Sequence, residues 1–343
     1  MSKVLSINRN TGILRRSSIV SPEDQFINQP DAPSIAALHK MFTSAGVPLA
    51  VSAARKAIEE ACIDVSQITH VVSTTCTDSA NPGFDHLVVK QLGITHSVEK
   101  VLLHGVGCSG GLATLRTAAN MALGHTFRRR PARILCIALE ICSTMVRSEL
   151  DRIDELQEVG IGVCLFSDCG AAVVLSNGVG EQTTDPIFDL LGWDHSVLPA
   201  TEDDLRFDLD PVGWKVVLSP RVPTFATEAL LPSFANLMQK INLPDEYRKV
   251  QNLHWAIHPG GVAILKGAEK ALGISPEHLR ASYEVYRSHG NSSSASIFSV
   301  LDRARSYEAK ACDGQHRTRD HVVGCAFGCV LAISEVRLLL GEN

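Results

Sequence analysis

Apolar and polar positions alternate along the chain with two different periods, one typical of helices and one typical of buried strands. Over residues 50–62 the apolar residues recur at helical spacing, which predicts an amphipathic helix. The β-branched run over residues 68–75 predicts a strand, and the unbroken apolar run over residues 133–140 predicts a strand buried on both faces. The same reasoning predicts further helices at residues 84–92, 109–123, 224–241, 261–272 and 294–309, and further strands at residues 98–106, 170–176, 186–193, 254–258 and 321–336.

Strands that alternate with helices in this way are typical of the α/β class. Glycines at positions 93, 124 and 273 are expected to end the helices that precede them. The turn-rich segment over residues 176–185 predicts a boundary between two parts of the chain.

Composition and charge narrow the function classes. The chain has 343 residues, of which 45% are hydrophobic and 20% are charged, which is typical of a folded globular protein. The net charge is −5, and the one basic cluster, Arg128–Arg130 with Arg133, is interpreted as a solvated turn before a strand. Nucleic acid is therefore not expected as a main partner.

The cellular location of the protein and the redox state of its cysteines follow from similar arguments. The start of the chain lacks the apolar core of a signal peptide, and no apolar run reaches the length of a membrane span, so a cytoplasmic protein is expected. Its ten cysteines are then expected to be reduced. They lack the paired spacing of a zinc site, so no metal is expected.

Cys108 is the sharpest candidate for chemistry. An apolar strand leads into the segment GVGCSGG, and a helix begins directly after it. A cysteine at a helix N-terminus lies near the positive end of the helix dipole, which favours the thiolate that acts as a nucleophile. The alternative is a buried cysteine in a tight strand-to-helix turn.

Two further segments place polar residues at element ends. His258 ends a short strand in AIHPGG, where it is suited to proton transfer or to donating to an oxyanion, although a structural histidine is the simpler interpretation. Asn291 lies in HGNSSSAS before a helix, where it could be an N-cap. Cys, His and Asn in this order also fit a papain-like hydrolase, but Cys108 lacks the aromatic residue that follows the nucleophile of that class.

At these three segments the chain resembles the type III polyketide synthases of the chalcone synthase group, and the fungal members most closely. The resemblance runs from Lys3 to the C-terminus. It also includes the segments LFSDCGAAVV (165–174), NPGFDHL (81–87) and PVGWKVVLSPRVP (211–223). Its implications are a thiolase-like fold of five layers (αβαβα) and two related halves, residues 1–178 and 179–343. The family works as a homodimer on acyl-CoA and malonyl-CoA and binds no metal and no organic cofactor.

The resemblance also implies residue roles. Cys108 would carry the acyl chain as a thioester, while His258 and Asn291 would donate hydrogen bonds to the malonyl thioester as it becomes an enolate. His258 would also stabilise the Cys108 thiolate as an ion pair. Phe166 matches the family's gatekeeping phenylalanine, and a plain core aromatic residue is the less favoured alternative.

Some positions differ from the plant enzymes of the family. Val216 matches a second gatekeeping phenylalanine and Met145 matches a threonine of the cavity, while Ser293 and Cys76 also align with cavity positions. A smaller residue at the gate favours a long fatty acyl starter, and hence alkylpyrone or alkylresorcinol products.

Other departures affect the completeness of the site. The segment AFGCV (326–330) lacks the family's Pro-Gly pair, and Asn81 replaces a methionine that reaches the partner subunit. The resemblance implies an N-terminally truncated member, because the family's first core strand precedes the position matched by Lys3. Lys3 matches one of three basic residues that meet the phosphates of coenzyme A, whereas the other two match Ser6 and Asn10. Arg9, Arg15 and Arg16 could compensate, or they could be solvated surface charges.

Three functions remain open from the sequence. The first is a polyketide synthase with several rounds of extension. The second is a β-ketoacyl synthase of the same fold that performs a single round. The third is a non-catalytic, truncated paralogue that acts only as a dimer partner, and a thioester hydrolase is a more distant alternative.

Overall fold

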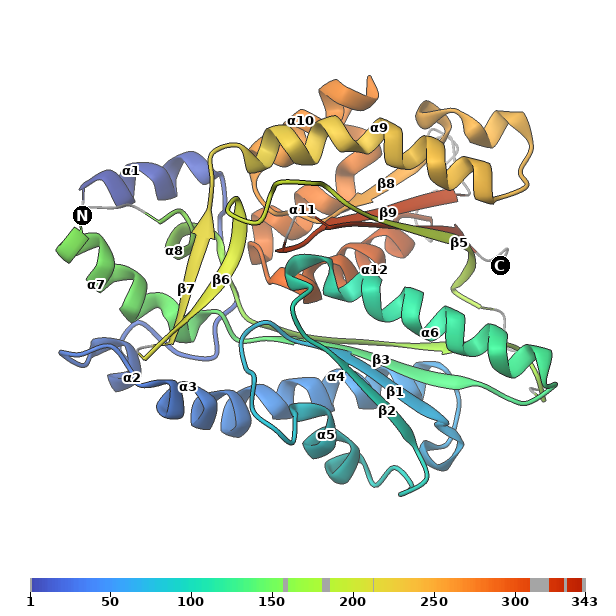
Figure 1. Ribbon diagram of the computed structural model, residues 1–343, viewed down its shortest axis with the longest axis horizontal. Helices are drawn as coiled ribbons and strands as arrows, with labels where there is room; N and C mark the ends of the chain where they lie inside the picture. The colour runs from blue at the N-terminus through green and yellow to red at the C-terminus, as the bar shows by residue number, and fades with distance from the viewer. Residues whose placement is uncertain are drawn as a thin grey trace.

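The computed structural model describes residues 2–156, 160–180, 186–211, 213–308, 321–329 and 332–340. These residues form five layers, in which two sheets share a pair of helices between them and each carries further helices on its outer face (Figure 1). The predicted α/β class is confirmed.

The first sheet has the strand order β2-β1-β3-β4. Its strands are β1 (His70–Thr74), β2 (Glu99–Leu103), β3 (Arg133–Glu140) and β4 (Cys169–Ser176). β1 is parallel to β2 and to β3, whereas β4 is antiparallel to β3. Every residue of β3 is buried, as its unbroken apolar run predicted.

The second sheet has the order β5-β10-β9-β8. Its strands are β5 (Phe188–Val197), β8 (His254–Ile257), β9 (His321–Phe327) and β10 (Ala332–Leu340). The directions of β8, β9 and β10 repeat those of β1, β3 and β4. β5 covers the outer edge of β10, whereas within the described ranges no strand pairs with the outer edge of β4.

Helices α6 (Gly110–Phe127) and α12 (Ser296–Glu308) lie between the two sheets. Their apolar residues join both sheets in one core cluster. The cluster includes Leu112, Leu115, Ile134, Ile297, Val300 and Val322.

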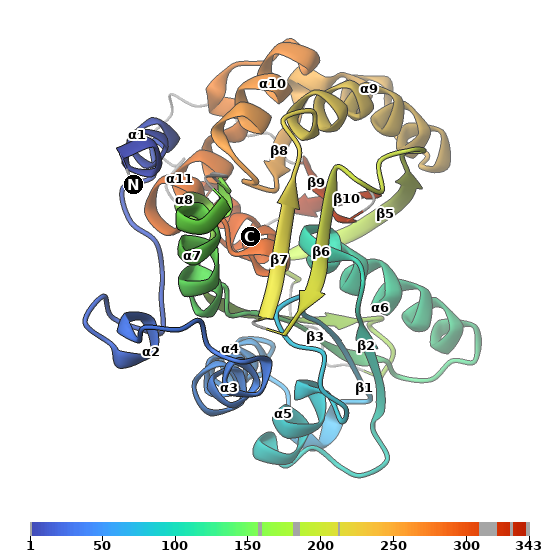
Figure 2. The ribbon, with the colours of Figure 1, turned by 60° about the vertical axis from the view of Figure 1, so that its left-hand side comes forward.

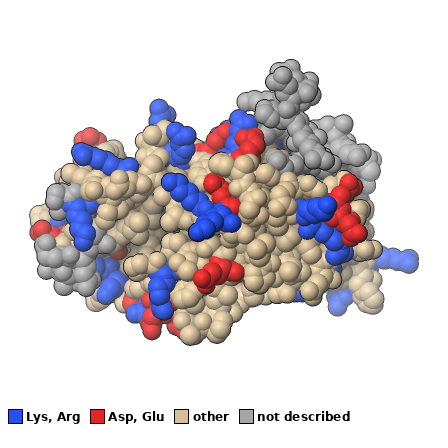
Figure 3. Space-filling model, turned by 90° about the horizontal axis from the view of Figure 1, so that it is seen from above, with Lys and Arg blue, Asp and Glu red and all other residues tan. Residues whose placement is uncertain are grey.

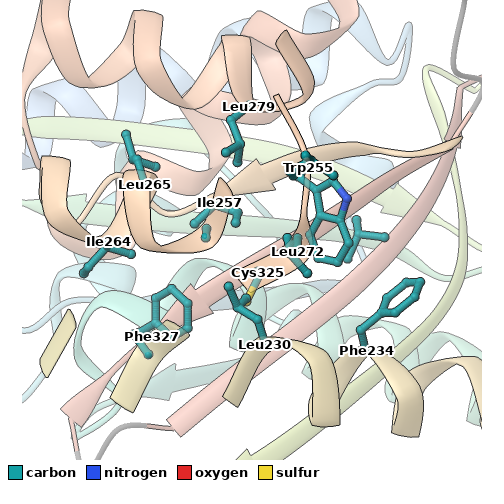
Figure 4. Close-up of a cluster of buried hydrophobic side chains, with 14 of the residues drawn as sticks. Leu230, Phe234, Trp255, Ile257, Ile264, Leu265, Leu272, Leu279, Cys325 and Phe327 are labelled. Carbon is teal, nitrogen blue, oxygen red and sulfur yellow. The ribbon is translucent and has the colours of Figure 1, made fainter. Parts of the chain in front are cut away.

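The outer layers are formed by separate helices. Helices α4 (Val47–Glu60) and α5 (Phe84–Leu92) cover the first sheet, and α9 (Val222–Lys240) and α10 (Val262–Leu272) cover the second. Figure 4 shows Trp255 and Phe327 of the second sheet facing Leu230 and Leu265 of these helices. Burial of each such side chain stabilises the fold by about 1.5–3 kcal/mol.

A two-stranded ribbon, β6 (Leu205–Asp210) with β7 (Gly213–Leu218), stands apart from both sheets and lies beside α7 and α8 (Figure 2). The remaining helices are α1 (Ser2–Thr11), α2 (Gln25–Asn28), α3 (Ile35–Met41), α7 (Val146–Leu156), α8 (Gly162–Leu165) and α11 (Arg280–His289). Short 3₁₀ or π turns are η1 (Phe42–Gly46), η2 (Val65–Gln67), η3 (Gly107–Ser109), η4 (Ser143–Met145), η5 (Asp245–Arg248), η6 (Val250–Asn252), η7 (Pro276–Leu279) and η8 (Ser293–Ala295).

The prediction that Gly124 ends its helix is wrong. Helix α6 continues to Phe127, and Arg128 caps it. A glycine ends a helix where the chain turns into the left-handed region, and here that turn comes later, at Arg129 with φ of 53°. By contrast, Gly93 and Gly273 do adopt this conformation and end α5 and α10 as predicted.

Candidate active site

Cys108 lies in η3, the turn that joins β2 to α6, and its side chain is buried. Glycines make this turn possible. Gly107 has φ of 55°, and a Cβ placed on it would come within 2.7 Å of the Cys329 sulfur. A Cβ on Gly111 would come within 2.4 Å of the Ser294 carbonyl oxygen, so this glycine lets η8 approach the start of α6.

The approach of η8 brings Ser293 between two cysteines. The Ser293 Oγ lies 3.4 Å from the Cys108 Sγ and 3.2 Å from the Cys76 Sγ, both within hydrogen-bond reach. Ser293 itself has φ of 47°, which is unusual for a residue other than glycine. Two of the predicted cavity residues therefore lie next to the candidate nucleophile.

A buried carboxyl group that the sequence reasoning missed adjoins these residues. Glu140, at the end of β3, accepts hydrogen bonds from the Cys76 backbone N–H at 3.1 Å, the Thr77 hydroxyl at 3.1 Å and the Ser294 hydroxyl. Burial raises the pKa of this carboxyl group, and the hydrogen bonds oppose that shift. The available signal was one acidic residue at the end of an otherwise apolar run over residues 133–140.

His258 follows β8 and is buried. Its backbone N–H donates to the Cys325 carbonyl at 2.8 Å, and its carbonyl accepts from the Gly260 N–H at 2.8 Å. Neither ring nitrogen has a hydrogen-bond partner within the described part of the chain. Burial lowers the pKa of His258 to about 3, so the imidazole is neutral at neutral pH.

Asn291 connects the His258 turn with the Cys108 turn. Its backbone pairs with the residues around Phe166: its N–H donates to the Leu165 carbonyl, and its carbonyl accepts from the Ser167 N–H, both at 2.9 Å. Its side-chain Nδ2 donates to the Gly260 carbonyl at 3.4 Å, and its Oδ1 accepts from the Ser293 N–H at 2.8 Å. The side chain thus supports the following turn, as an N-cap would, and also faces the His258 loop.

The electrostatics of Cys108 differ from the sequence-based expectation of a thiolate. Burial raises the pKa of the Cys108 thiol to about 12, and the hydrogen bond with Ser293 offsets only part of that shift. The positive end of α6 does not overcome this desolvation. Both shifts favour a thiol and a neutral imidazole over the expected ion pair with His258.

The predicted gate residues meet in a second cluster. Phe166, Met145 and Cys142 are buried together, and the ribbon β6–β7 contributes Val216 and Trp214 to the same cluster. A small hollow of about 10 Å³, room for about one water molecule, lies beside Phe166, Met145 and Val216, and Arg16 and Glu149 also line it. Burial raises the pKa of Glu149.

The four basic residues considered for coenzyme A phosphates separate into two kinds. Arg16 is partly solvent-exposed, but its guanidinium is engaged within the chain: it donates to the carbonyls of Val163 at 2.5 Å and Phe166 at 3.3 Å. Lys3, Arg9 and Arg15 are exposed and have no ionic partner in the described ranges. Arg16 thus supports the turn that carries Phe166, which is a third role beside the two weighed from the sequence.

The two departures from the family pattern lie in different surroundings. In AFGCV, the described residues 326–329 bring Cys329 against Gly107, while residue 330 lies outside the described residues. Asn81 is exposed. The residues that the structure describes contain no group of three or more acidic, histidine or cysteine side chains placed to hold a metal ion. Within the same ranges no helix is long and apolar enough to span a membrane.

The fold and the site together define a thiolase-like acyltransferase. Residues 11–179 match the N-terminal domain of chalcone and stilbene synthases, and residues 190–340 match the C-terminal domain. The chain belongs to the chalcone and stilbene synthase family.

Its relatives show that it is a type III polyketide synthase. The chain is 40% identical to the type III polyketide synthase PspB of Penicillium soppii, with 98% of this chain and 87% of that protein covered. It is 37% identical to the acylalkylpyrone synthase CsyB of Aspergillus oryzae, over 89% of this chain and 78% of CsyB.

Solved structures agree in fold. The type III pentaketide synthase of Neurospora crassa is 57% identical and superposes with a TM-score of 0.96, covering 99% of this chain and 90% of that one. A structure of CsyB complexed with CoA-SH is 35% identical and gives a TM-score of 0.95 with the same coverage.

Proposed function

We propose that this synthase loads a long-chain fatty acyl group from coenzyme A onto Cys108. It then extends the chain with malonyl-CoA and closes it into an alkylpyrone or alkylresorcinol. One observation carries the proposal: hydrogen bonds through Ser293, Asn291 and Gly260 link the buried thiol of Cys108 to the turn that carries His258, whose imidazole has no hydrogen-bond partner in the described ranges.

Loading requires the thiol to lose its proton. The Cys108 sulfur attacks the acyl carbonyl carbon, its proton passes to the neutral imidazole of His258, and the departing CoA thiolate then takes that proton. The products are an acyl-Cys108 thioester and free CoA-SH. The Ser293 hydroxyl, 3.4 Å from the sulfur, stabilises the developing negative charge.

Extension uses the same residues as donors. Malonyl-CoA loses its carboxylate as carbon dioxide, and the electron pair becomes an enolate on the thioester carbonyl. The His258 imidazole and the Asn291 amide donate to that oxygen while the carbanion attacks the acyl-Cys108 carbonyl. Cys108 leaves as the thiolate, and the chain, two carbons longer, continues on coenzyme A.

The preference for a long starter rests on the gate cluster. Phe166 is the aromatic residue matched to the family's gate, and the second gate position carries the smaller Val216, which favours passage of a flexible alkyl chain once the side chains of this cluster rearrange. The name of the relative CsyB, an acylalkylpyrone synthase, supports the same product class.

The test is the mass of the products formed from malonyl-CoA and a series of acyl-CoA starters of increasing length. We expect cyclic products that need at least two extensions, with the highest rates for long chains. Products of one extension without a ring would instead indicate a single-round β-ketoacyl synthase. Absence of any product or carbon dioxide would indicate a non-catalytic partner.

We further propose that the chain is a homodimer and that residues 1–178 and 179–343 are its two functional halves. The division keeps Cys108 in one half and His258 with Asn291 in the other. A sedimentation mass near 37.0 kDa, that of one chain, would contradict the dimer.

A further inference from the structure

The C-terminal end of α6 exposes two large apolar side chains. Phe127 is 91% exposed and Leu123 is 57% exposed, whereas most apolar residues of the same helix are buried. Positions four apart on a helix share a face, so these side chains stand together. A phenylalanine so fully exposed is unusual, and adjacent exposed apolar residues mark contact surfaces.

Three arginines follow directly. Arg128, Arg129 and Arg130 are exposed, and within the described residues none of their side chains has an ion pair or a hydrogen bond. The nearby Glu99 faces His70, at 3.8 Å, and pairs with none of the three arginines. The sequence-based interpretation of a solvated turn holds for these three arginines but not for Arg133, which is buried and donates to the Gly180 carbonyl.

The position of this end in the molecule matters as much as its composition. It lies at the extremity of the molecule, at the opposite end of α6 from Cys108 (Figure 1). The helix has 18 residues, so the two ends are about 27 Å apart. In Figure 3, a basic side chain projects clear of the surface at the edge where α6 ends in Figure 1. This end can therefore meet another surface without obstructing the active site.

We propose that the α6 tip, defined as Leu123, Phe127 and Arg128–Arg130, docks onto the surface of an anionic phospholipid bilayer. The guanidinium group of an arginine can donate two parallel hydrogen bonds to a lipid phosphate. An exposed aromatic ring beside the arginines can enter the boundary between head groups and acyl chains. The chain as a whole carries a net charge of −5, so an anionic bilayer repels the rest of the molecule. The α6 tip is therefore the part that contacts the bilayer. Screening over about 8–10 Å confines the attraction to residues close to the bilayer.

The experiment is co-sedimentation of the full chain with vesicles of phosphatidylcholine alone, or of phosphatidylcholine with phosphatidylserine in about a two-to-one ratio. We expect binding to the phosphatidylserine vesicles only. Replacing Arg128, Arg129 and Arg130 by glutamine should reduce partition by about fivefold per charge, and high salt should do the same. Phe127→Ser should weaken binding at every salt concentration.

Matched controls lie elsewhere on the surface. Leu209→Ser removes an apolar side chain that is 66% exposed on β6, and Lys56→Gln removes an exposed charge on α4, so both should bind as the parent does. Absence of binding to either kind of vesicle would overturn the proposal, as would equal binding of the parent and the tip variants. Loss of a dimer in Phe127→Ser without vesicle binding would also overturn it, because the tip would then be a contact between protein copies.

Discussion

At the scale of single residues, the site contains two pKa shifts that have the same cause, which is burial. Burial raises the pKa of Cys108 and lowers that of His258, so both groups are neutral in the free protein. Transfer of the proton from sulfur to imidazole is therefore part of the reaction rather than a property of the resting site. Within the described residues, the hydrogen bond from Ser293 favours the charged form of Cys108.

This state predicts the pH dependence of thiol reactivity. The fraction of Cys108 thiolate should rise about tenfold per pH unit below a pKa of about 12, because only the deprotonated sulfur reacts. Alkylation of Cys108 by iodoacetamide, followed by peptide mass, should therefore accelerate steadily between about pH 6 and pH 9. A rate that levels off near neutral pH would contradict it and would indicate a resting thiolate–imidazolium pair.

The position of Asn291 predicts that replacing it affects condensation and loading to different extents. Asn291→Ala should slow condensation by a factor of about a hundred to a thousand, because one donor to the enolate is lost. Loading of Cys108 should change far less, since the amide does not contact the sulfur. The measurement is carbon dioxide release against acyl-adduct formation, with Asn120→Ala at an exposed position of α6 as the matched control. Equal loss in both steps would show a structural role for Asn291 alone.

At the scale of elements, the turn after α8 carries Phe166 and is supported by Arg16. Arg16→Met should loosen this turn, because the carbonyls of Val163 and Phe166 lose their donor, and should raise KM for acyl-CoA more than it lowers kcat. Arg16→Lys should restore part of the effect. A direct coenzyme A contact would instead give a KM that depends strongly on salt concentration, with Arg15→Met showing a similar loss.

The place of Val216 on the ribbon β6–β7 predicts how the length of the acyl-CoA starter affects activity. Val216→Phe adds an aromatic ring to the cluster of Phe166 and Met145 and should narrow the hollow between them. Activity should shift from long to short acyl-CoA starters, measured as relative kcat/KM across chain lengths. An unchanged profile would place the acyl chain elsewhere, and Leu209→Phe on the outside of the same ribbon is the control.

Sequence reasoning located the elements whose pattern is local. The unbroken apolar run of β3 and the glycines after α5 and α10 were sufficient, because burial and left-handed turns leave a direct mark on the residues. The ribbon β6–β7 and helices α1, α7 and α11 were not predicted from the pattern. Gly124 was misread because a glycine permits a helix end without requiring one.

At the scale of the whole molecule, the site assembles residues that are far apart in the sequence. The motifs predicted Cys108, His258 and Asn291, but only the fold places Ser293 between Cys76 and Cys108 and gathers donors around Glu140. Desolvation was equally invisible in the sequence, because it depends on the two sheets and the middle layer closing around the site. This desolvation opposes the expected thiolate.

The two sheets also differ in completeness. β5 covers β10, while the matching edge of β4 has no partner in the described ranges, and the side chains of β4 are only partly buried although those of neighbouring β3 are fully buried. Helices α4 and α12 pack against β4, so its faces are covered while its outer edge has no paired strand in the described ranges. The site residues lie on other elements and keep their contacts.

The most direct test of the central claim is the mass of the intact protein after incubation with a long-chain acyl-CoA, followed by addition of labelled malonyl-CoA. We predict a mass increase of one acyl group on Cys108, then loss of that adduct with release of labelled carbon dioxide. Cys108→Ala should show neither event. An acyl adduct that persists in Cys108→Ala, or the absence of any adduct on the parent chain, would contradict the assignment of Cys108 as the nucleophile.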